Sequence, residues 1–403
     1  MNIEYLESLV KKYGSPLYVY DAEKIISQYQ SLENAFSSAN KLRINYAVKA
    51  LSNISILKLI KSLNGNIDCV SIQEVQLGLK AGFDPFQISF TPSGISMAEL
   101  DKAVGYGVKI TLDSLSILKE FGQKYPEIPV SIRINPHIMA GGNKKISVGH
   151  VASKFGISKD HMPEVEKIIN ETGTRIDGVH MHTGSDILDI DVFIRGAEVL
   201  FDIAKKFDDL EFIDFGGGFK VAYKEGDSAT DIQKFGKIMS KRFNEFCKEY
   251  GKDLSMEFEP GKFLVSECGY FLVHVNVIKP NSETIFAGID SGMNHLIRPM
   301  YYGAYHDIEN ISNPNGKEKE YTVVGYICEN DTFAVNRSIA EIKQGDILSF
   351  KNAGAYCFSM ASNYNSRCRP AEVLVYQNKD YLIREREIFE DLINHQIEVS
   401  LDL

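Results

Sequence analysis

Side chains that can do chemistry stand at the ends of four short apolar runs of the sequence. Lys49 ends the run RINYAVK, while His182 ends IDGVHMH and Ser185 lies just beyond it. Three glycines, Gly216 to Gly218, follow EFIDF, and Glu259 ends SMEFE. If these runs are parallel strands of one barrel, their carboxyl ends bring the groups together at one mouth.

Each of these groups also has an ordinary interpretation. Lys49 could simply reach solvent, whereas partial desolvation would favour the neutral amine that forms Schiff bases. The three glycines could make a tight turn, or they could let backbone N–H groups approach a phosphate closely. No G-K-[ST] follows them in register, so they form neither a Walker motif nor a dinucleotide fingerprint.

His182, Ser185 and Glu259 could be polar loop and ion-pairing residues, but together with Lys49 they suit one cofactor. An imidazole can stack on a planar ring, and a hydroxyl can bind phosphate. A carboxylate beside a pyridine nitrogen keeps that nitrogen protonated, which makes the ring an electron sink. The combination predicts a site for pyridoxal 5'-phosphate.

A metal site is not expected from the sequence. His180 and His182 alternate along their run, and we expect them to point to opposite faces of a strand. No carboxylate lies near them at a familiar ligand spacing.

The first two thirds of the chain predict an α/β fold. Segments at 55–62, 72–80, 97–104 and 191–207 have helical periodicity and lie between strand-like runs. This alternation favours a (β/α)8 TIM-like barrel over an open doubly wound sheet. The predicted strands are 43–49, 66–71, 87–91, 109–113, 130–135, 176–182, 211–215 and 255–259.

A second, mostly β domain is predicted after about residue 270, where helical periodicity fades. We place the barrel at residues 27–270 and the β domain, a sandwich or barrel, at 271–403. Residues 1–26 join the β domain, because the run PLYVY at 16–20 can pair with its sheet. The predicted strands are 270–278, 284–289, 321–327, 347–351 and 372–376.

Composition narrows the classes of function. The net charge is -10 at pH 7, so the chain does not have the excess of basic residues that is typical of nucleic-acid-binding proteins. It also gives no reason to expect binding to an anionic membrane. No run of 18 apolar residues occurs, and the first residues do not resemble a signal peptide. The six cysteines form no C-x-x-C pair, so we expect reduced thiols in a cytoplasmic protein.

The chain resembles the diaminopimelate decarboxylases, which belong to the barrel-type (fold type III) pyridoxal-phosphate decarboxylases. The resemblance extends from residue 16 to about residue 391. The matching motifs are YAVKA (46–50), DCVSIQE (68–74), RINPH (133–137), SKFGI (153–157), HMHTGSD (180–186), DFGGGF (214–219), EPGK (259–262), DSGMNHLIRPMYYGAYH (290–306), VVGYICEND (323–331) and GAYCFSMASNYNSRCRPAEVL (354–374).

The resemblance implies an enzyme, a carboxy-lyase, that converts meso-2,6-diaminopimelate to L-lysine and CO₂ in the last step of lysine biosynthesis. It implies that Lys49 carries the cofactor, that His182 stacks on the cofactor ring and that Glu259 pairs with the pyridine nitrogen. The implied phosphate contacts are Ser185, Gly217, Gly218 and the loop at Gly261 and Lys262.

The resemblance also implies how the substrate is held. Tyr356 would reach the cofactor phosphate or the substrate, and Arg298, Tyr302 and Glu329 would grip the far amino-acid end. Cys328 would be the proton donor. Because Cys328 and Glu329 come from the partner subunit in relatives, a homodimer with shared sites is implied.

The sequence departs from the family pattern at Lys262, where the family usually has an arginine that contacts phosphate or substrate carboxylate. Lysine keeps the charge but loses the bidentate fork. The segment CENDTF after the cysteine is one residue short, and Leu51 replaces a common asparagine.

Three other functions are considered. A decarboxylase of lysine, ornithine or carboxynorspermidine would share the mechanism, but Arg298 favours a substrate with a far carboxylate. An amino-acid racemase needs a second base on the other face of the cofactor ring, and the sequence offers no clear candidate. A non-catalytic cofactor-binding protein of the single-barrel type needs no second domain carrying a substrate clamp.

Overall fold

The structure is a computed structural model that describes residues 1–138 and 153–401. It divides into two compact units. The barrel unit comprises Ile25–Ala222 and Gly226–Leu264, and the sheet unit comprises Met1–Lys24, Tyr223–Glu225 and Val265–Leu403. No helix in the described ranges is long and apolar enough to cross a membrane.

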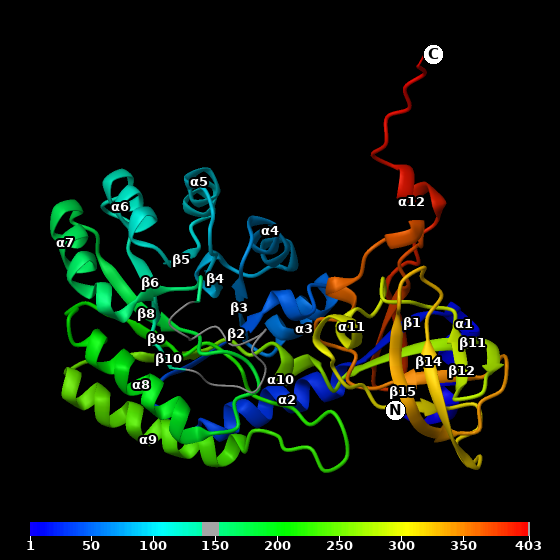
Figure 1. Ribbon diagram of the computed structural model, residues 1–403. Coiled ribbons are helices and arrows are strands. Elements are labelled where there is room, and N and C mark those ends of the chain that lie inside the picture. The colour runs from blue at the N-terminus through cyan, green and yellow to red at the C-terminus, as the bar shows by residue number, and fades with distance from the viewer. Residues whose placement is uncertain (139–152, 402–403) are drawn as a thin grey trace. The chain divides into compact units, whose positions relative to one another are not determined.

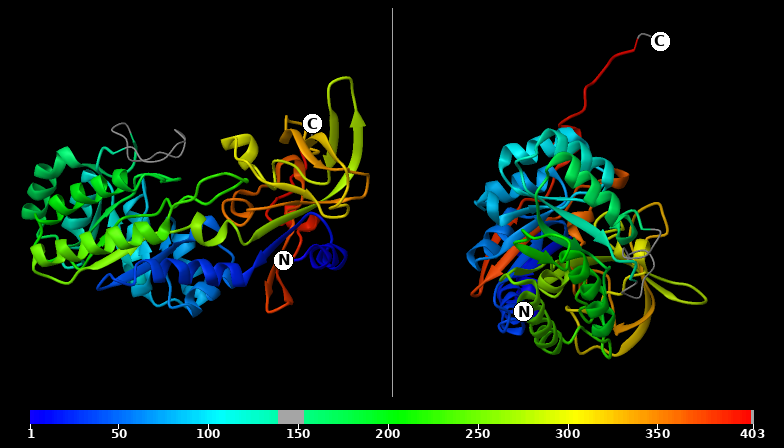
Figure 2. Two further views of the ribbon diagram at one scale, coloured as in Figure 1. Left: turned by 90° about the horizontal axis from the view of Figure 1, so that it is seen from below. Right: turned by 90° about the vertical axis from the view of Figure 1, so that its left-hand side faces the viewer.

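A closed ring of parallel strands forms the centre of the barrel unit, as Figures 1 and 2 show. Each predicted run of the barrel contributes one strand, and β10 pairs with β2 to close the ring, so the predicted barrel is confirmed. In order around the ring the strands are β2 (Leu42–Ala47), β3 (Asn66–Cys69), β4 (Ile88–Phe90), β5 (Lys109–Leu112), β6 (Val130–Asn135), β8 (Ile176–Met181), β9 (Phe212–Asp214) and β10 (Ser255–Phe258). The short β7 (Ile157–Ser158) pairs with β6.

Helices follow the strands and cover the outside of the ring (Figure 1). Side-chain caps start several of them; Ser71, for example, accepts a hydrogen bond from the Glu74 N–H at the start of α4. The helices of this part of the chain are α2 (Ala22–Ala35), α3 (Ile54–Ser62), α4 (Ile72–Ala81), α5 (Met97–Tyr106), α6 (Leu115–Lys124), α7 (Met162–Thr172), α8 (Ile190–Ala204), α9 (Ile232–Tyr250) and α10 (Lys262–Val265).

The strand β10 has an apolar side chain on its outer face and buried carboxyl groups on either side of it in the sequence. Phe258 of β10 points outward, and its ring centroid lies 6.1 Å from that of Phe235 on α9. The neighbouring Glu257 and Glu259 are also buried, at 1% and 7% exposure. Inside the barrel, Nδ2 of Asn45 donates to Glu257 at 2.8 Å and to Asp214 at 3.2 Å. The barrel therefore buries carboxyl groups, which require polar partners.

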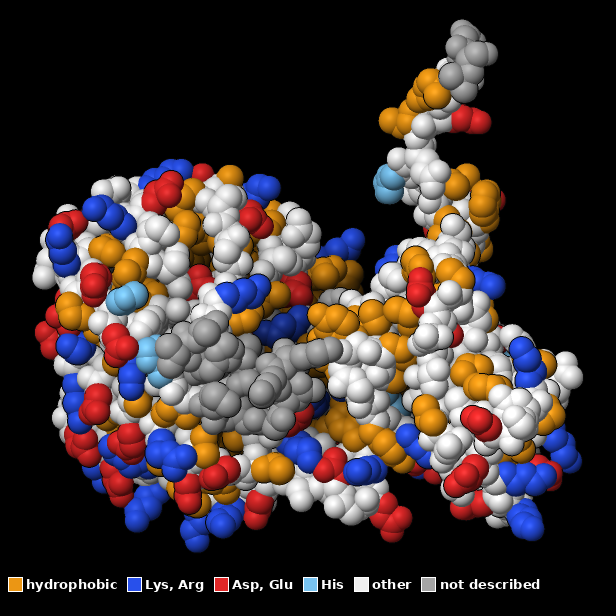
Figure 3. Space-filling model, in the orientation of Figure 1, with side chains coloured by type: hydrophobic (Ala, Val, Ile, Leu, Met, Phe, Trp, Pro, Cys, Tyr) orange, Lys and Arg blue, Asp and Glu red, His pale blue; other side chains and the backbone are white. Residues whose placement is uncertain are grey.

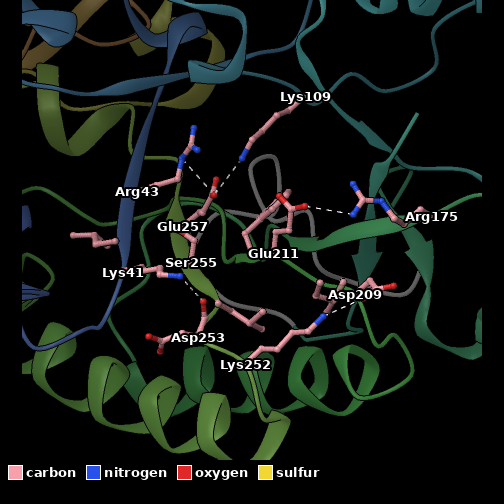
Figure 4. Close-up of a pocket in the computed structure, with 14 residues that line it drawn as sticks. Lys41, Arg43, Lys109, Arg175, Asp209, Glu211, Lys252, Asp253, Ser255 and Glu257 are labelled. Carbon is pink, nitrogen blue, oxygen red and sulfur yellow. Dashed lines mark hydrogen bonds and ion pairs between the residues drawn. The ribbon is translucent and has the colours of Figure 1, made fainter. Parts of the chain in front are cut away.

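A pocket of about 870 Å³ lies at the amino-terminal ends of the barrel strands (Figure 4). Arg43 and Lys109 reach the buried carboxylate of Glu257, with nitrogen–oxygen distances of 3.4 and 3.7 Å. Arg175 pairs with Glu211 at 3.5 Å on the exposed rim. Residues at this end of such barrels contribute to stability rather than to catalysis.

Replacing Glu257 with alanine is expected to lower the free energy of unfolding by about 3 kcal/mol, because Arg43 and Lys109 lose a buried partner. Urea denaturation followed by circular dichroism measures the change. The matched control, Glu211→Ala, removes an exposed ion pair and should cost less than about 1 kcal/mol. Equal losses in the two variants would contradict this interpretation of the pocket.

The sheet unit is built on one mixed sheet. β1 (Leu17–Asp21) pairs antiparallel with β11 and parallel with β17, so the predicted pairing of the PLYVY run with the later strands is confirmed. The other strands are β11 (Gly269–Pro280), β12 (Ile285–Ile289), β13 (Ile308–Asn310), β14 (Glu318–Val324), β15 (Thr332–Ala340), β16 (Ile347–Phe350), β17 (Ala371–Tyr376) and β18 (Lys379–Arg384).

Short helices complete the sheet unit: α1 (Ile3–Tyr13), α11 (Arg298–Tyr302) and α12 (Phe389–Ile393). The apolar face of α1 packs on the sheet, where Leu6 and Val10 join a buried cluster with Leu17. Apolar side chains also gather on the exposed C-terminal segment (Figure 3), where Ile388 and Phe389 are 58% and 64% exposed.

Candidate active site

Lys49 lies just after the end of β2, in a short 3-10 turn (Val48–Ala50). Its Nζ is 3.4 Å from Oδ2 of Asp68, which is fully buried at the end of β3. The hydroxyl of Thr91 donates to the other oxygen of Asp68 and so orients that carboxylate. The ion pair with Asp68 holds the amine in place. Because the Lys49 side chain is 41% exposed, the amine is still accessible to a ligand.

The glycine loop after β9 lies against His182. The N–H of Gly217 donates to Nδ1 of His182 at 3.2 Å, so in the neutral ring the proton is on Nε2. Burial and the nearby Arg133 lower the pKa of His182 well below its ordinary value, which keeps the ring neutral. A neutral, oriented imidazole is suited to lie against a planar cofactor.

The loop tolerates only glycine. A Cβ at Gly217 would lie 2.3 Å from the carbonyl oxygen of Glu259, and one at Gly218 would lie 2.2 Å from that of Gly184. Gly218 also has a φ of 109°, which other residues rarely adopt. The absence of side chains leaves the backbone of this loop open to close approach by a ligand.

Glu259 belongs to a buried group of titratable residues. Its Oε1 lies 3.1 Å from Nε2 of His180, but in a geometry that leaves both atoms without a hydrogen bond. Burial, reinforced by Asp68, raises the pKa of Glu259 to about 8. Burial lowers the pKa of His180 to about 4, and burial together with Glu259 raises the pKa of Asp214 well above its ordinary value.

The expectation that His180 and His182 point to opposite faces of a strand was wrong. Side chains two residues apart on a strand point to the same face, and the structure places His180 against Glu259 and His182 against the glycine loop, both inside the barrel. Ligand-type atoms of His180, Asp214 and Glu259 also lie within 4.8 Å of one another. The carboxylates come from other strands, so spacing along the sequence could not reveal them.

Pyridoxal phosphate fits these residues. Oε1 of Glu259 is a buried acceptor without a hydrogen bond, and a protonated pyridine nitrogen would supply the missing donor. The open backbone of Gly217 and Gly218 suits the phosphate, and Lys49 is the accessible amine. Metal binding is less favoured here, because burial raises the pKa values of the Asp214 and Glu259 carboxyl groups and a metal ion binds carboxyl groups in their deprotonated form.

Lys262, the departure from the family pattern, has a specific partner. Its Nζ lies 2.7 Å from Oδ1 of Asp186, which directly follows Ser185 in the loop after β8. Asp186 adopts a left-handed φ of 62°, so the loop holds this carboxylate in a demanding conformation. The pair joins the loops that carry Ser185 and Gly261 in the barrel unit.

The sheet unit gathers the predicted substrate residues. Arg298, 7% exposed, begins α11, and its Nη1 donates to the carbonyl oxygen of Ala355 at 3.2 Å. Ala355 precedes Tyr356, whose φ of 57° is unusual for a side chain of its size. Tyr302 lies at the other end of α11. Arg298 and Tyr356 are therefore neighbours, as a shared binding role requires.

Cys328 and Glu329 are exposed residues of the turn after β14. Glu329 lines a pocket of about 570 Å³ together with Met300 of α11 and Ile297, the residue that precedes this helix. The pocket thus places the predicted acidic clamp, Glu329, beside the helix that carries the buried arginine.

Comparison with known proteins identifies the family. Residues 22–266 match the family described as "Pyridoxal-dependent decarboxylase, pyridoxal binding domain". Diaminopimelate decarboxylase of Methanothermobacter thermautotrophicus is 40% identical over 96% of this chain and 93% of that protein. The chain belongs to the diaminopimelate decarboxylase family.

Two further relatives support this assignment. Diaminopimelate decarboxylase of Campylobacter jejuni is 36% identical over 96% of this chain and 97% of its own. The crystal structure of diaminopimelate decarboxylase from Helicobacter pylori complexed with L-lysine superposes with a TM-score of 0.89 at 34% identity, covering 96% of this chain and 98% of that one. Pyridoxal phosphate is accordingly the cofactor of this decarboxylase family, and the predicted cofactor is confirmed.

Several residues of the site were not assigned from the sequence. Asp68, Asp214 and Arg133 lie in the motifs DCVSIQE, DFGGGF and RINPH, and each side chain is buried in the barrel. Thr91 and Asp186 act through these or neighbouring groups. Their positions at predicted strand ends could have marked them as candidate site residues. Their contact partners could not be predicted, because these depend on which strands are neighbours in the barrel.

The buried carboxyl of Glu259 predicts a pH dependence for the cofactor-free protein. Because its pKa in the folded state, about 8, lies above the ordinary 4.5, the folded state retains a proton that the unfolded chain loses. The free energy of unfolding, relative to Glu259→Gln, should therefore fall as pH rises through this window. Urea denaturation at several pH values measures it. In the control Glu211→Gln, the free energy of unfolding should depend on pH as it does in the wild-type protein. The same pH dependence in Glu259→Gln as in the wild-type protein would contradict the prediction.

Proposed function

We propose that this chain decarboxylates meso-2,6-diaminopimelate to L-lysine and CO₂, the last step of lysine biosynthesis. The observation that carries the proposal is the match, over nearly the whole chain, to proteins named diaminopimelate decarboxylase. The buried guanidinium of Arg298 supports it, because a buried arginine suits the carboxylate at the far end of this substrate.

The cofactor site is assigned to residues of the barrel unit. Lys49 would hold the cofactor aldehyde through Nζ, His182 would lie against the ring and Glu259 would pair with the pyridine nitrogen. Ser185, Gly217, Gly218 and Gly261 would hold the phosphate, with Lys262 acting beside them through its pair with Asp186. Pyridoxal phosphate, when bound, supplies an electron sink for the pair left when a carbon–carboxylate bond breaks.

The substrate groups are assigned to the sheet unit. Arg298, Tyr302 and Glu329 would bind the far amino-acid end, with Tyr356 reaching the substrate or the phosphate. Sγ of Cys328 would give its proton to the carbon that has lost CO₂ and regain one from solvent. Each turnover then consumes one proton and releases one CO₂, which balances the reaction.

We further propose a cytoplasmic homodimer with shared sites, in which Cys328 and Glu329 serve the partner's cofactor. Both residues are exposed in the single chain, and so are the apolar side chains of the C-terminal segment. Exposed apolar surface of this kind is typical of protein contacts. All six cysteines are free, which suits a reducing compartment.

The test is product formation by the cofactor-loaded protein from meso-diaminopimelate, lysine and ornithine in parallel. Lysine and CO₂ from diaminopimelate alone support the proposal. Turnover of lysine or ornithine instead would retain the chemistry and reject the substrate, and no turnover of any of the three would reject decarboxylation.

Arg298→Met is expected to raise KM for diaminopimelate by about tenfold or more, because a charge-assisted contact to the far carboxylate is lost. Steady-state kinetics measures the change. Arg195→Met, on an exposed position of α8, is the matched control and should leave KM unchanged. An unchanged KM in the Arg298 variant would remove this residue from the substrate site.

A further inference from the structure

Two adjacent side chains reach the predicted proton donor and acidic clamp from a separate turn of the sheet unit. Tyr364 and Asn365 lie in the 3-10 turn η5 (Tyr364–Ser366), more than thirty residues beyond Cys328 and Glu329. The Tyr364 hydroxyl donates to Oε1 of Glu329 at 2.9 Å. The amide of Asn365 lies against Cys328.

The amide of Asn365 presents both of its polar atoms to the thiol. Nδ2 lies 3.1 Å from Sγ of Cys328, and Oδ1 lies 3.4 Å from the same sulfur. The thiol S–H can donate to Oδ1, and the N–H can donate to the sulfur once the proton has left. One side chain therefore serves as hydrogen-bond partner for both protonation states of the sulfur.

The turn that carries these side chains is anchored on both sides. Ser362 N–H donates to the carbonyl of Asn294 at 2.7 Å, and Nδ2 of Asn363 donates to Glu387 at 2.6 Å. Asn365 itself has a left-handed φ of 57°. A conformation of this kind is costly for a side chain, and it persists where the surrounding structure requires it.

The turn that carries Cys328 and Glu329 is also held in place. Asp331, 4% exposed, accepts a hydrogen bond from the N–H of Ile327 at 3.1 Å, and its own N–H donates to the carbonyl of Glu329 at 2.8 Å. The contacts of Tyr364 and Asn365 therefore join two anchored turns rather than two loose loops.

Tyr364 remains a donor over the working pH range. Its hydrogen bond to Glu329, with a contribution from Cys328, raises the pKa of the phenol to about 12. The hydroxyl and the Glu329 carboxylate also line the same pocket. The hydroxyl can thus hold one carboxylate oxygen while the other remains available to a ligand.

We propose that Asn365 and Tyr364 are positioning residues with separate tasks, a proposal that rests on the proposed function. Asn365 orients Sγ of Cys328 for proton delivery and donates its amide N–H to the sulfur once the sulfur is deprotonated. Tyr364 orients the Glu329 carboxylate toward the far end of the substrate. The first task bears on turnover and the second on substrate binding.

The test compares kinetics and solvent isotope effects of the cofactor-loaded variants. Asn365→Gly removes the side chain and suits the left-handed backbone. It should lower kcat about tenfold at nearly constant KM and increase the solvent deuterium isotope effect on kcat. Tyr364→Phe should raise KM about fivefold with little change in kcat. The controls are Asn378→Gly, at a φ of 58°, and the exposed Tyr381→Phe, both on the hairpin of β17 and β18.

The outcomes separate the two proposals. If Cys328→Ala is impaired but the Asn365 and Tyr364 variants behave like their controls, the positioning proposal is wrong and the proposed function stands. If Cys328→Ala retains wild-type activity, the assigned proton donor is wrong and the positioning proposal fails with it. If both variants show a lower kcat, a higher KM and a lower cofactor content together, the two residues have a structural role, and this result would also overturn the proposal.

Discussion

Replacing Lys49 with alanine is expected to lower kcat for decarboxylation by at least about 10⁴-fold, because the amine assigned to hold the cofactor covalently is removed. The fold should survive, because the side chain is 41% exposed and Asp68, with which it forms an ion pair, is also held by Thr91. Lys49→Arg should be equally inactive, because a guanidinium keeps the charge but forms no Schiff base at neutral pH.

Product assays with saturating cofactor measure this effect. The control is Lys58→Ala, an exposed lysine of α3, which should retain wild-type kcat. Circular dichroism checks that each variant is folded. Substantial turnover by a folded Lys49→Ala protein would place the covalent attachment at another lysine.

Cys328→Ala is the second large effect, with an expected loss of kcat of about 10²- to 10⁴-fold, the range for removing a positioned general acid. The side chain is exposed in the single chain and packs in no buried cluster, so stability should be nearly unchanged. KM should change little, because the thiol is assigned to proton transfer rather than to binding.

The matched control for this residue is Cys368→Ala. Cys368 is the other cysteine of the sheet unit that is not fully buried, and no role in the site is assigned to it. Rates measured under saturating substrate distinguish the two variants. Similar rates in Cys328→Ala and wild type would require a different proton donor.

Much of the barrel could be predicted because its strands are short apolar runs that alternate with amphipathic helices. The boundaries were less accurate where a strand leads into another element. The run predicted at 66–71 ends as a strand at Cys69, because Ser71 becomes the cap of α4. Likewise Lys49 lies in a 3-10 turn beyond β2 rather than in the strand itself.

The pairings inside the site could not be predicted from the sequence. The contact of Glu259 with His180 and that of Asn45 with Asp214 join strands that become neighbours or face each other only when the ring closes. The expectation that His180 and His182 diverge was wrong because strand periodicity puts them on one face. The partner of Lys262 was unforeseen, since Asp186 is 76 residues away in the sequence.

The contacts of the sheet unit were harder still. The hydrogen bonds of Tyr364 and Asn365 link irregular turns, for which no sequence periodicity exists. The motif that contains both residues was noted for its resemblance to the family, but a motif gives no geometry. Only the three-dimensional structure shows that Tyr364 contacts Glu329 and that Asn365 contacts Cys328.

The most direct test of the account is to locate the cofactor on the chain. Borohydride reduction of the cofactor-loaded protein makes the lysine–cofactor link permanent, and peptide mass spectrometry then finds the modified residue. The account predicts modification on the peptide that contains Lys49 and none in Lys49→Ala. Modification at Lys262 or any other lysine, with Lys49 unmodified, would contradict the assignment of Lys49 as the residue that carries the cofactor.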